Sequence, residues 1–172
     1  GGAFEGLDVA VNFHPNKINE ATVGVSTAVN SAKFHFYGKA SHAANAPENG
    51  RSALDAVELT DIGANYLREH VPSDVRIHYT IVAPNIVPDK AVVWYYMRAF
   101  SREVVENVYE RLVKVAKGAA MMTETELEIE FLGGCYNTQN NQVLAGVVAE
   151  AMNEIPQEPW TQEELDFAAA LD

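Results

Sequence analysis

The chain has 172 residues, 48% of them hydrophobic, enough for one domain with a sizeable core and part of another. Its 24 acidic and 12 basic residues give a net charge of −12, a field that repels nucleic acid and anionic membrane surfaces. Its one cysteine excludes an internal disulfide, and no apolar run reaches the roughly 18 residues of a membrane helix. We therefore expect a cytoplasmic protein with neither nucleic acid nor a membrane as its partner.

Two extended segments open the chain. The first lies within residues 1–19 and ends at His14, directly before a proline that stops sheet pairing. The second covers residues 21–37, which are rich in Val, Thr, Phe and Tyr and are followed by a glycine. Residues 38–50 then form a loop that leads to the first predicted helix.

Helices and further strands alternate in the middle of the chain. Ser52, with an aspartate three residues later, resembles a capping box at the start of a helix. Ser101 is placed to cap a second helix, whose apolar stripe closes near Gly118. Period-two or doubly apolar patterns predict strands at residues 75–81, 91–97 and 125–131.

The order of these elements predicts the fold class. Between residues 21 and 132 it reads strand, helix, strand, strand, helix, strand, which is the ferredoxin-like α+β order: a four-stranded antiparallel sheet with both helices on one face. Residues 142–154 and 160–171 are predicted to be helices outside this sandwich. We also expect the segment at 91–97 and an edge strand without charges at 23–29 to favour pairing of two copies.

Four polar residues are candidates for chemistry, each with a plainer alternative. His42 lies among small residues in a loop, although a lone loop histidine is more often a hydrogen-bonded surface residue. His14 ends a strand, where it could bind a metal or simply bond to backbone. Arg98 has the planar fork that suits a carboxylate, and Asn85 lies in a turn where a structural role is the default. The five histidines match no compact zinc motif by spacing.

A long motif adds a family resemblance. Residues 38–57, GKASHAANAPENGRSALDAV, closely resemble the lid-domain histidine motif of the zinc-dependent aminoacylase and carboxypeptidase superfamily. The similarity continues in order at residues 12–15 (NFHP), 84–88 (PNIVP), 97–99 (MRA), 118–125 (GAAMMTET) and 158–160 (EPW). The resemblance implies a ferredoxin-like lid, or dimerisation, domain at 20–134, flanked by catalytic-domain remnants at 1–19 and 135–172.

The resemblance also implies roles for the four candidates. His42 would donate a hydrogen bond to the developing oxyanion in the other subunit's site, and Asn85 and Arg98 would orient the substrate and its carboxylate. His14 would bind one of two zinc ions. The remaining ligands are expected before residue 1 and after residue 172, so we expect the chain to be an inactive fragment without tightly bound zinc.

The resemblance implies a homodimeric metallopeptidase-like amidohydrolase. Its substrate would be an N-acyl or aminobenzoyl amide of an amino acid such as glutamate. A stand-alone ferredoxin-like interaction module is the alternative.

Overall fold

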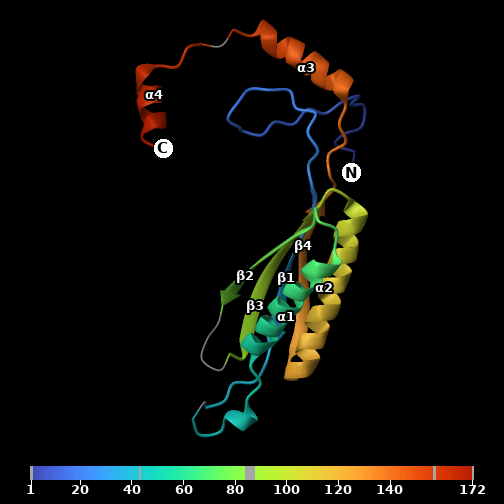
Figure 1. The fold of residues 1–172 in the computed structure, drawn as a ribbon, viewed down its shortest axis with the longest axis vertical. Coiled ribbons are helices and arrows are strands. Elements are labelled where there is room, and N and C mark those ends of the chain that lie inside the picture. The colour runs from blue at the N-terminus through green and yellow to red at the C-terminus, as the bar shows by residue number, and fades with distance from the viewer. Residues whose placement is uncertain (1, 43, 84–87, 157, 172) are drawn as a thin grey trace. The chain divides into compact units, whose positions relative to one another are not determined.

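The computed structural model describes residues 2–42, 44–83, 88–156 and 158–171 (Figure 1). The chain divides into two compact units, one made of residues 25–139 and the other of residues 1–24 with 140–172. The first unit contains the sheet and the larger helices, and the second contains two shorter helices.

The unit of residues 25–139 has the predicted ferredoxin-like architecture. Its four strands lie in the order β2-β3-β1-β4, and every neighbouring pair is antiparallel. Helices α1 and α2 both cover one face of this sheet (Figure 1). The elements are β1 (Ala28–Tyr37), α1 (Ala53–Leu67), β2 (Arg76–Ala83), β3 (Lys90–Ala99), α2 (Arg102–Thr123) and β4 (Glu126–Cys135), with single 3-10 turns at Pro47–Asn49 and Arg68–His70.

Strand alternation and helix caps produce this fold as the sequence predicts. Every second residue of β1 is buried under the helices, which is the period of a strand with one covered face. The Ser52 hydroxyl accepts from the Asp55 amide at 3.2 Å, and Ser101 accepts from the Val104 amide at 3.5 Å, so both predicted caps are confirmed. The largest fully buried apolar side chains are Tyr95, Phe34, Phe36, Met97, Leu112, Val57, Val93, Val105 and Val108.

Two expected boundaries and one expected strand are wrong. Helix α2 continues past Gly118 to Thr123, because Ala119 and Ala120 are buried in that last turn and their packing outweighs the poor helix propensity of glycine. The described residues before β1 form no strand, although those at 7–13 alternate and those at 21–27 are rich in Val and Thr. Both stretches are mostly exposed and pair with no strand of the described structure, so their propensity is not realised.

The expected edge strand at residues 23–29 is also wrong. β1 begins only at Ala28 and lies between β3 and β4, so it is a central strand. The edges are β2 and β4. The doubly apolar segment at 91–97 belongs to β3, an interior strand whose second face keeps Val92 buried and Trp94 half-buried.

One carboxylate lies inside the core. Asp61 of α1 is 6% exposed and accepts a hydrogen bond from the hydroxyl of Tyr95 on β3. Burial raises the pKa of Asp61 to about 6, and the Glu58 carboxylate adds to this, whereas the Tyr95 bond and Arg68 oppose it. Burial and the neighbouring Asp61 also raise the pKa of Tyr95, so the phenol stays protonated and remains the donor.

The second unit contains helices α3 (Gln142–Glu154) and α4 (Gln162–Ala169). Asn141 caps α3, and α4 begins with the predicted capping box between Thr161 and Glu164. Neither helix buries a residue in the described structure. Among the described residues, no helix has the length and apolar character needed to cross a membrane.

Candidate functional site

The loop that carries His42 is closed at its base by backbone hydrogen bonds. Lys39 and Arg51 exchange two of them, each 2.8 Å long, and the Gly38 amide donates to the Asp89 carbonyl at 2.8 Å. A Cβ atom on Gly38 would lie 2.0 Å from the Arg51 carbonyl oxygen, so this close approach requires glycine. The base of the loop is therefore fixed to the end of β1.

Hydrogen bonds inside the loop hold its shape. The Ser41 hydroxyl donates to the Ala46 carbonyl, and the Ala46 amide donates to the His42 carbonyl at 3.1 Å. The Gly50 amide closes the 3-10 turn by donating to Pro47 at 3.0 Å. His42 therefore lies on a structured segment, although its own side chain is exposed.

Two backbone amides select the tautomer of His42. The amides of Ala44 and Asn45 lie 3.3 and 3.2 Å from Nδ1 of the imidazole. A backbone N–H only donates, so Nδ1 is the acceptor and the ring hydrogen of the neutral imidazole is on Nε2. The exposed side chain thus presents Nε2–H as a hydrogen-bond donor, which is the group needed to stabilise a developing oxyanion.

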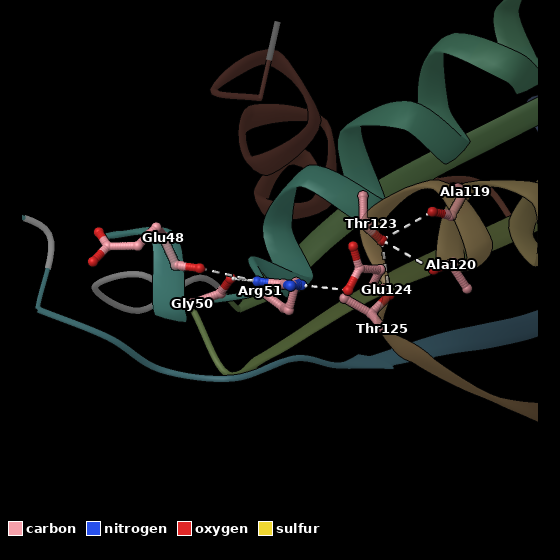
Figure 2. A network of polar contacts seen from close by, with 8 residues as sticks. All are labelled: Glu48, Gly50, Arg51, Ala119, Ala120, Thr123, Glu124 and Thr125. Carbon is pink, nitrogen blue, oxygen red and sulfur yellow. Dashed lines mark hydrogen bonds and ion pairs between the residues drawn. The ribbon is translucent and has the colours of Figure 1, made fainter. Parts of the chain in front are cut away.

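A side-chain bridge connects this loop to the end of α2 (Figure 2). Arg51 donates through Nε to a Glu124 carboxylate oxygen at 2.9 Å, and through Nη1 to the carbonyls of Gly50 at 2.6 Å and Glu48 at 3.3 Å. The sequence alone marks neither Arg51 nor Glu124 as a site residue. Arg51 lies within the motif at 38–57, but 73 residues separate it from Glu124, and no spacing rule connects them.

Arg98 lies on the face of the sheet that the helices do not cover. It is exposed, and its guanidinium carbon is 5.8 Å from the centre of the Tyr96 ring on the same strand. In the described residues it has no ion pair, so its planar fork is available to an anion. Arg76, its cross-strand partner on β2, donates to the carbonyls of Ser73 and Val75.

The structure does not bring Arg98 and His42 of one chain together. Arg98 pairs with Val29 near the start of β1, whereas the His42 loop follows Tyr37 at the other end of that strand. The eight residue-to-residue steps from Val29 to Tyr37 correspond to roughly 26 Å at about 3.3 Å per step. Figure 1 shows the loop projecting beyond this far end of the sheet. Asn85 lies outside the described residues.

His14 is exposed, and its Nδ1 lies 2.8 Å from the carbonyl oxygen of Pro15. Because a carbonyl only accepts, Nδ1 carries a hydrogen, and in the neutral imidazole Nε2 then has a lone pair that could bind a metal. The described part of the chain contains no group of three or more His, Cys, Asp or Glu side chains able to hold a metal ion. A catalytic zinc site ordinarily needs three protein ligands, so these residues alone do not fit one.

Comparison with known proteins identifies the domain. Residues 28–122, more than half of the chain, match the family model of the peptidase dimerisation domain. The chain belongs to this family. The matched segment begins at the start of β1 and ends in the last turn of α2, so it covers the loop of His42, Arg98 and both helices.

Individual relatives agree with this assignment. The chain is 40% identical over 179 residues to one of the subunits of the p-aminobenzoyl-glutamate hydrolase of Escherichia coli (strain K12), covering 99% of this chain and 36% of that protein. It is 34% identical to the Xaa-Arg dipeptidase of Mus musculus, covering 87% of this chain and 36% of the relative. Both relatives are hydrolases by name, and the chain spans about a third of their length.

A solved structure shares the fold. The crystal structure of an aminobenzoyl-glutamate utilization protein from Klebsiella pneumoniae superimposes with a TM-score of 0.62 at 25% sequence identity. The superposition covers 76% of this chain and 34% of that protein.

Proposed function

We propose that this chain contains the lid of a homodimeric, zinc-dependent amidohydrolase. The substrate would be an N-acyl or aminobenzoyl amide of an amino acid such as glutamate, a class that includes the compound in the name of the relative that is 40% identical. The proposal is carried by the His42 imidazole, whose exposed Nε2–H donor lies on a structured loop of a peptidase dimerisation domain. The protein would be cytoplasmic, with residues 20–134 as the lid and residues 1–19 and 135–172 as parts of a catalytic domain.

Each candidate residue has one role in this proposal. His42 donates from Nε2 to the oxyanion that forms when the amide carbonyl is attacked. Arg98, which has no ion pair among the described residues, binds the substrate carboxylate through its guanidinium fork, and Asn85 helps to orient the substrate. His14 would supply one ligand to a zinc pair whose other ligands lie outside the described residues.

The separation of Arg98 from His42 supports a site shared between two subunits. One small amide substrate cannot bridge roughly 26 Å of sheet to reach both side chains of one chain. If both act on the same substrate, Arg98 comes from one subunit and His42 from its partner. A domain of a dimerisation family provides the pairing that this arrangement needs.

The two sheet edges differ in a way that favours β2 as the pairing edge. β4 carries Glu126, Glu128 and Glu130, whose charges discourage strand addition. The pairing of each edge strand is irregular at one point, for β4 at Ser31/Ala32 and for β2 at Ile81/Ala83, so this feature does not distinguish the two edges. β2 has no acidic residue, and its exposed stretch at 80–82 is Thr-Ile-Val. An edge of this kind presents unpaired backbone groups to a second copy.

Substitution of His42 in the complete enzyme tests the catalytic role. His42→Ala is expected to lower kcat for p-aminobenzoyl-glutamate by about 10²- to 10³-fold, because the lost contact forms only in the transition state. Metal content, measured by mass spectrometry, is expected to stay unchanged. Normal turnover in this variant would remove the catalytic assignment.

Mixing two variants tests the shared site. When subunits of His42→Ala and Arg98→Ala reassort at random, half of the dimers are mixed, and one of the two sites in each is intact. Activity should therefore recover to about a quarter of the parent's value. A mixture of His42→Ala with His42→Asn is the matched control, since it can restore no site. Recovery no greater than in this control would show that one chain supplies both residues.

A further inference from the structure

Glu124 has a backbone conformation that glutamate rarely adopts. It ends α2 with a φ of 54° and a ψ of 39°, the left-handed region, and it is the only non-glycine residue with positive φ in the described structure. Glycine is the usual residue at this position of a helix terminus, because a Cβ atom is unfavourable there. A glutamate at this position therefore needs a reason that lies in its side chain.

The side chain of Glu124 has one ion-pair partner in the described structure, Arg51. Arg51 bonds at once to the carboxylate of Glu124 and to two carbonyls of the His42 loop, at Gly50 and Glu48 (Figure 2). A planar guanidinium fork reaches three acceptors in this way, whereas a lysine ammonium on a flexible stem does not hold such a geometry. The bridge fixes the loop to the end of α2, beyond what the backbone bonds at its base provide.

We propose that Arg51 and Glu124 are positioning residues, which anchor the loop so that the His42 imidazole meets the substrate in the correct place. This inference rests on the proposed role of His42. The left-handed glutamate is kept because its carboxylate orients Arg51, and Arg51 in turn fixes the segment from Glu48 to Gly50. Small displacements of a catalytic group lower turnover strongly, by as much as about 100-fold for 1 Å.

Glu124→Gly separates positioning from stability. Glycine relieves the left-handed backbone strain, and the exposed ion pair that it removes contributes little to stability. We expect the Tm of the 172-residue chain to stay unchanged or rise. We expect kcat of the complete enzyme to fall about 10- to 100-fold, with KM changed less than about twofold, because the oxyanion contact belongs to the transition state. Arg51→Lys, which keeps the charge without the fork, is expected to lower kcat similarly.

Amide hydrogen exchange measures how often the hydrogen bonds of the loop open, and it does not require an active enzyme. The Asn45 and Ala46 amides, which donate within the loop, are expected to exchange about tenfold faster in Glu124→Gly than in the parent chain. Arg111→Met is the matched control, because Arg111 also ties α2 to a backbone carbonyl, that of His70, at 2.7 Å but outside the loop. In Arg111→Met, the exchange rates of the Asn45 and Ala46 amides and the kcat of the complete enzyme are expected to equal those of the parent.

The outcomes separate this inference from the proposed function. Unchanged kcat and unchanged loop exchange in Glu124→Gly would overturn the anchor, and so would a fall in Tm that accounts for the lost activity. If His42→Ala turns over normally, the catalytic role fails, and unchanged loop exchange would then reject the anchor independently. Slow turnover together with fast loop exchange at an undiminished Tm is the result that the anchor requires.

Discussion

The buried carboxylate of Asp61 is expected to make the lid less stable at neutral pH than at mildly acidic pH. Its pKa is about 6 in the folded chain, against 3.8 for an ordinary aspartate, so the folded state holds the proton more tightly than the unfolded state. The tighter hold on the proton stabilises the folded state, and this contribution is fully present below pH 3.8 and is lost as the pH rises through 6. The direction is opposite to that of a carboxylate stabilised by an ion pair.

The size of the effect follows from the shift in pKa. About two pKa units at roughly 1.4 kcal/mol each give at most about 3 kcal/mol, and about 2 kcal/mol of this is lost between pH 4 and pH 7. Asp61→Asn removes the charge and still offers an oxygen to the Tyr95 hydroxyl, so we expect the variant to be more stable than the parent at pH 7 and to lose most of this advantage at pH 4.

Urea denaturation between pH 4 and pH 8 gives the free energy of unfolding of the parent chain and of Asp61→Asn. In the difference between these two free energies, the contributions of the other titrating groups largely cancel. Glu58→Gln is a second check, because the Glu58 carboxylate helps to raise the pKa of Asp61 and its removal should reduce the pH dependence. A difference between parent and Asp61→Asn that is constant over this range would refute the reasoning.

Two further substitutions test the loop base and the pairing edge. Gly38→Ala places a Cβ against the Arg51 carbonyl and is expected to destabilise the chain by about 1–3 kcal/mol in urea denaturation. At Gly118 a Cβ would meet no atom within 4 Å other than its chain neighbours and the backbone of its own helix, so Gly118→Ala should stabilise α2 by about 1 kcal/mol. If both glycines tolerate alanine equally, the close approach at the loop base is not rigid. Val82→Lys on the β2 edge should convert dimers to monomers, as measured by light scattering, whereas Leu132→Lys on the β4 edge should leave the dimers intact. The reverse result would assign the pairing of the two copies to β4.

The elements that the sequence predicted well carry their signals locally. Ser52 and Ser101 begin their helices where the capping pattern places them, because a cap involves only residues three positions apart. The glutamates of β4 and the even alternation of β2 likewise report which face of each strand is covered. Together with the order of elements, these local signals were sufficient for the ferredoxin-like arrangement.

The errors arise where the outcome depends on residues far along the chain. Nothing within residues 21–37 indicates that pairing begins at Ala28 or that β3 and β4 occupy both of its sides. The alternation at residues 7–13 meets no sheet in the described structure, so its β propensity has no consequence there. The histidine loop is recognisable from its motif, but the bond between Arg51 and Glu124 joins residues 73 positions apart, and no spacing predicts it.

Asp61 and Glu124 both break a local rule, and the physical consequences of the two differ. A charged group in the core and a glutamate in the left-handed region each oppose stability, and such exceptions in natural proteins tend to accompany function. The carboxylate of Glu124 bonds to Arg51 in the loop of the proposed catalytic histidine, so its unfavourable backbone conformation is accompanied by a contact that can serve catalysis. Among the described residues, the carboxylate of Asp61 bonds only to the Tyr95 hydroxyl, within a core of apolar side chains. If removal of the Asp61 charge raises stability at pH 7 without changing turnover, while Glu124→Gly keeps stability and lowers turnover, then only the second exception is functional.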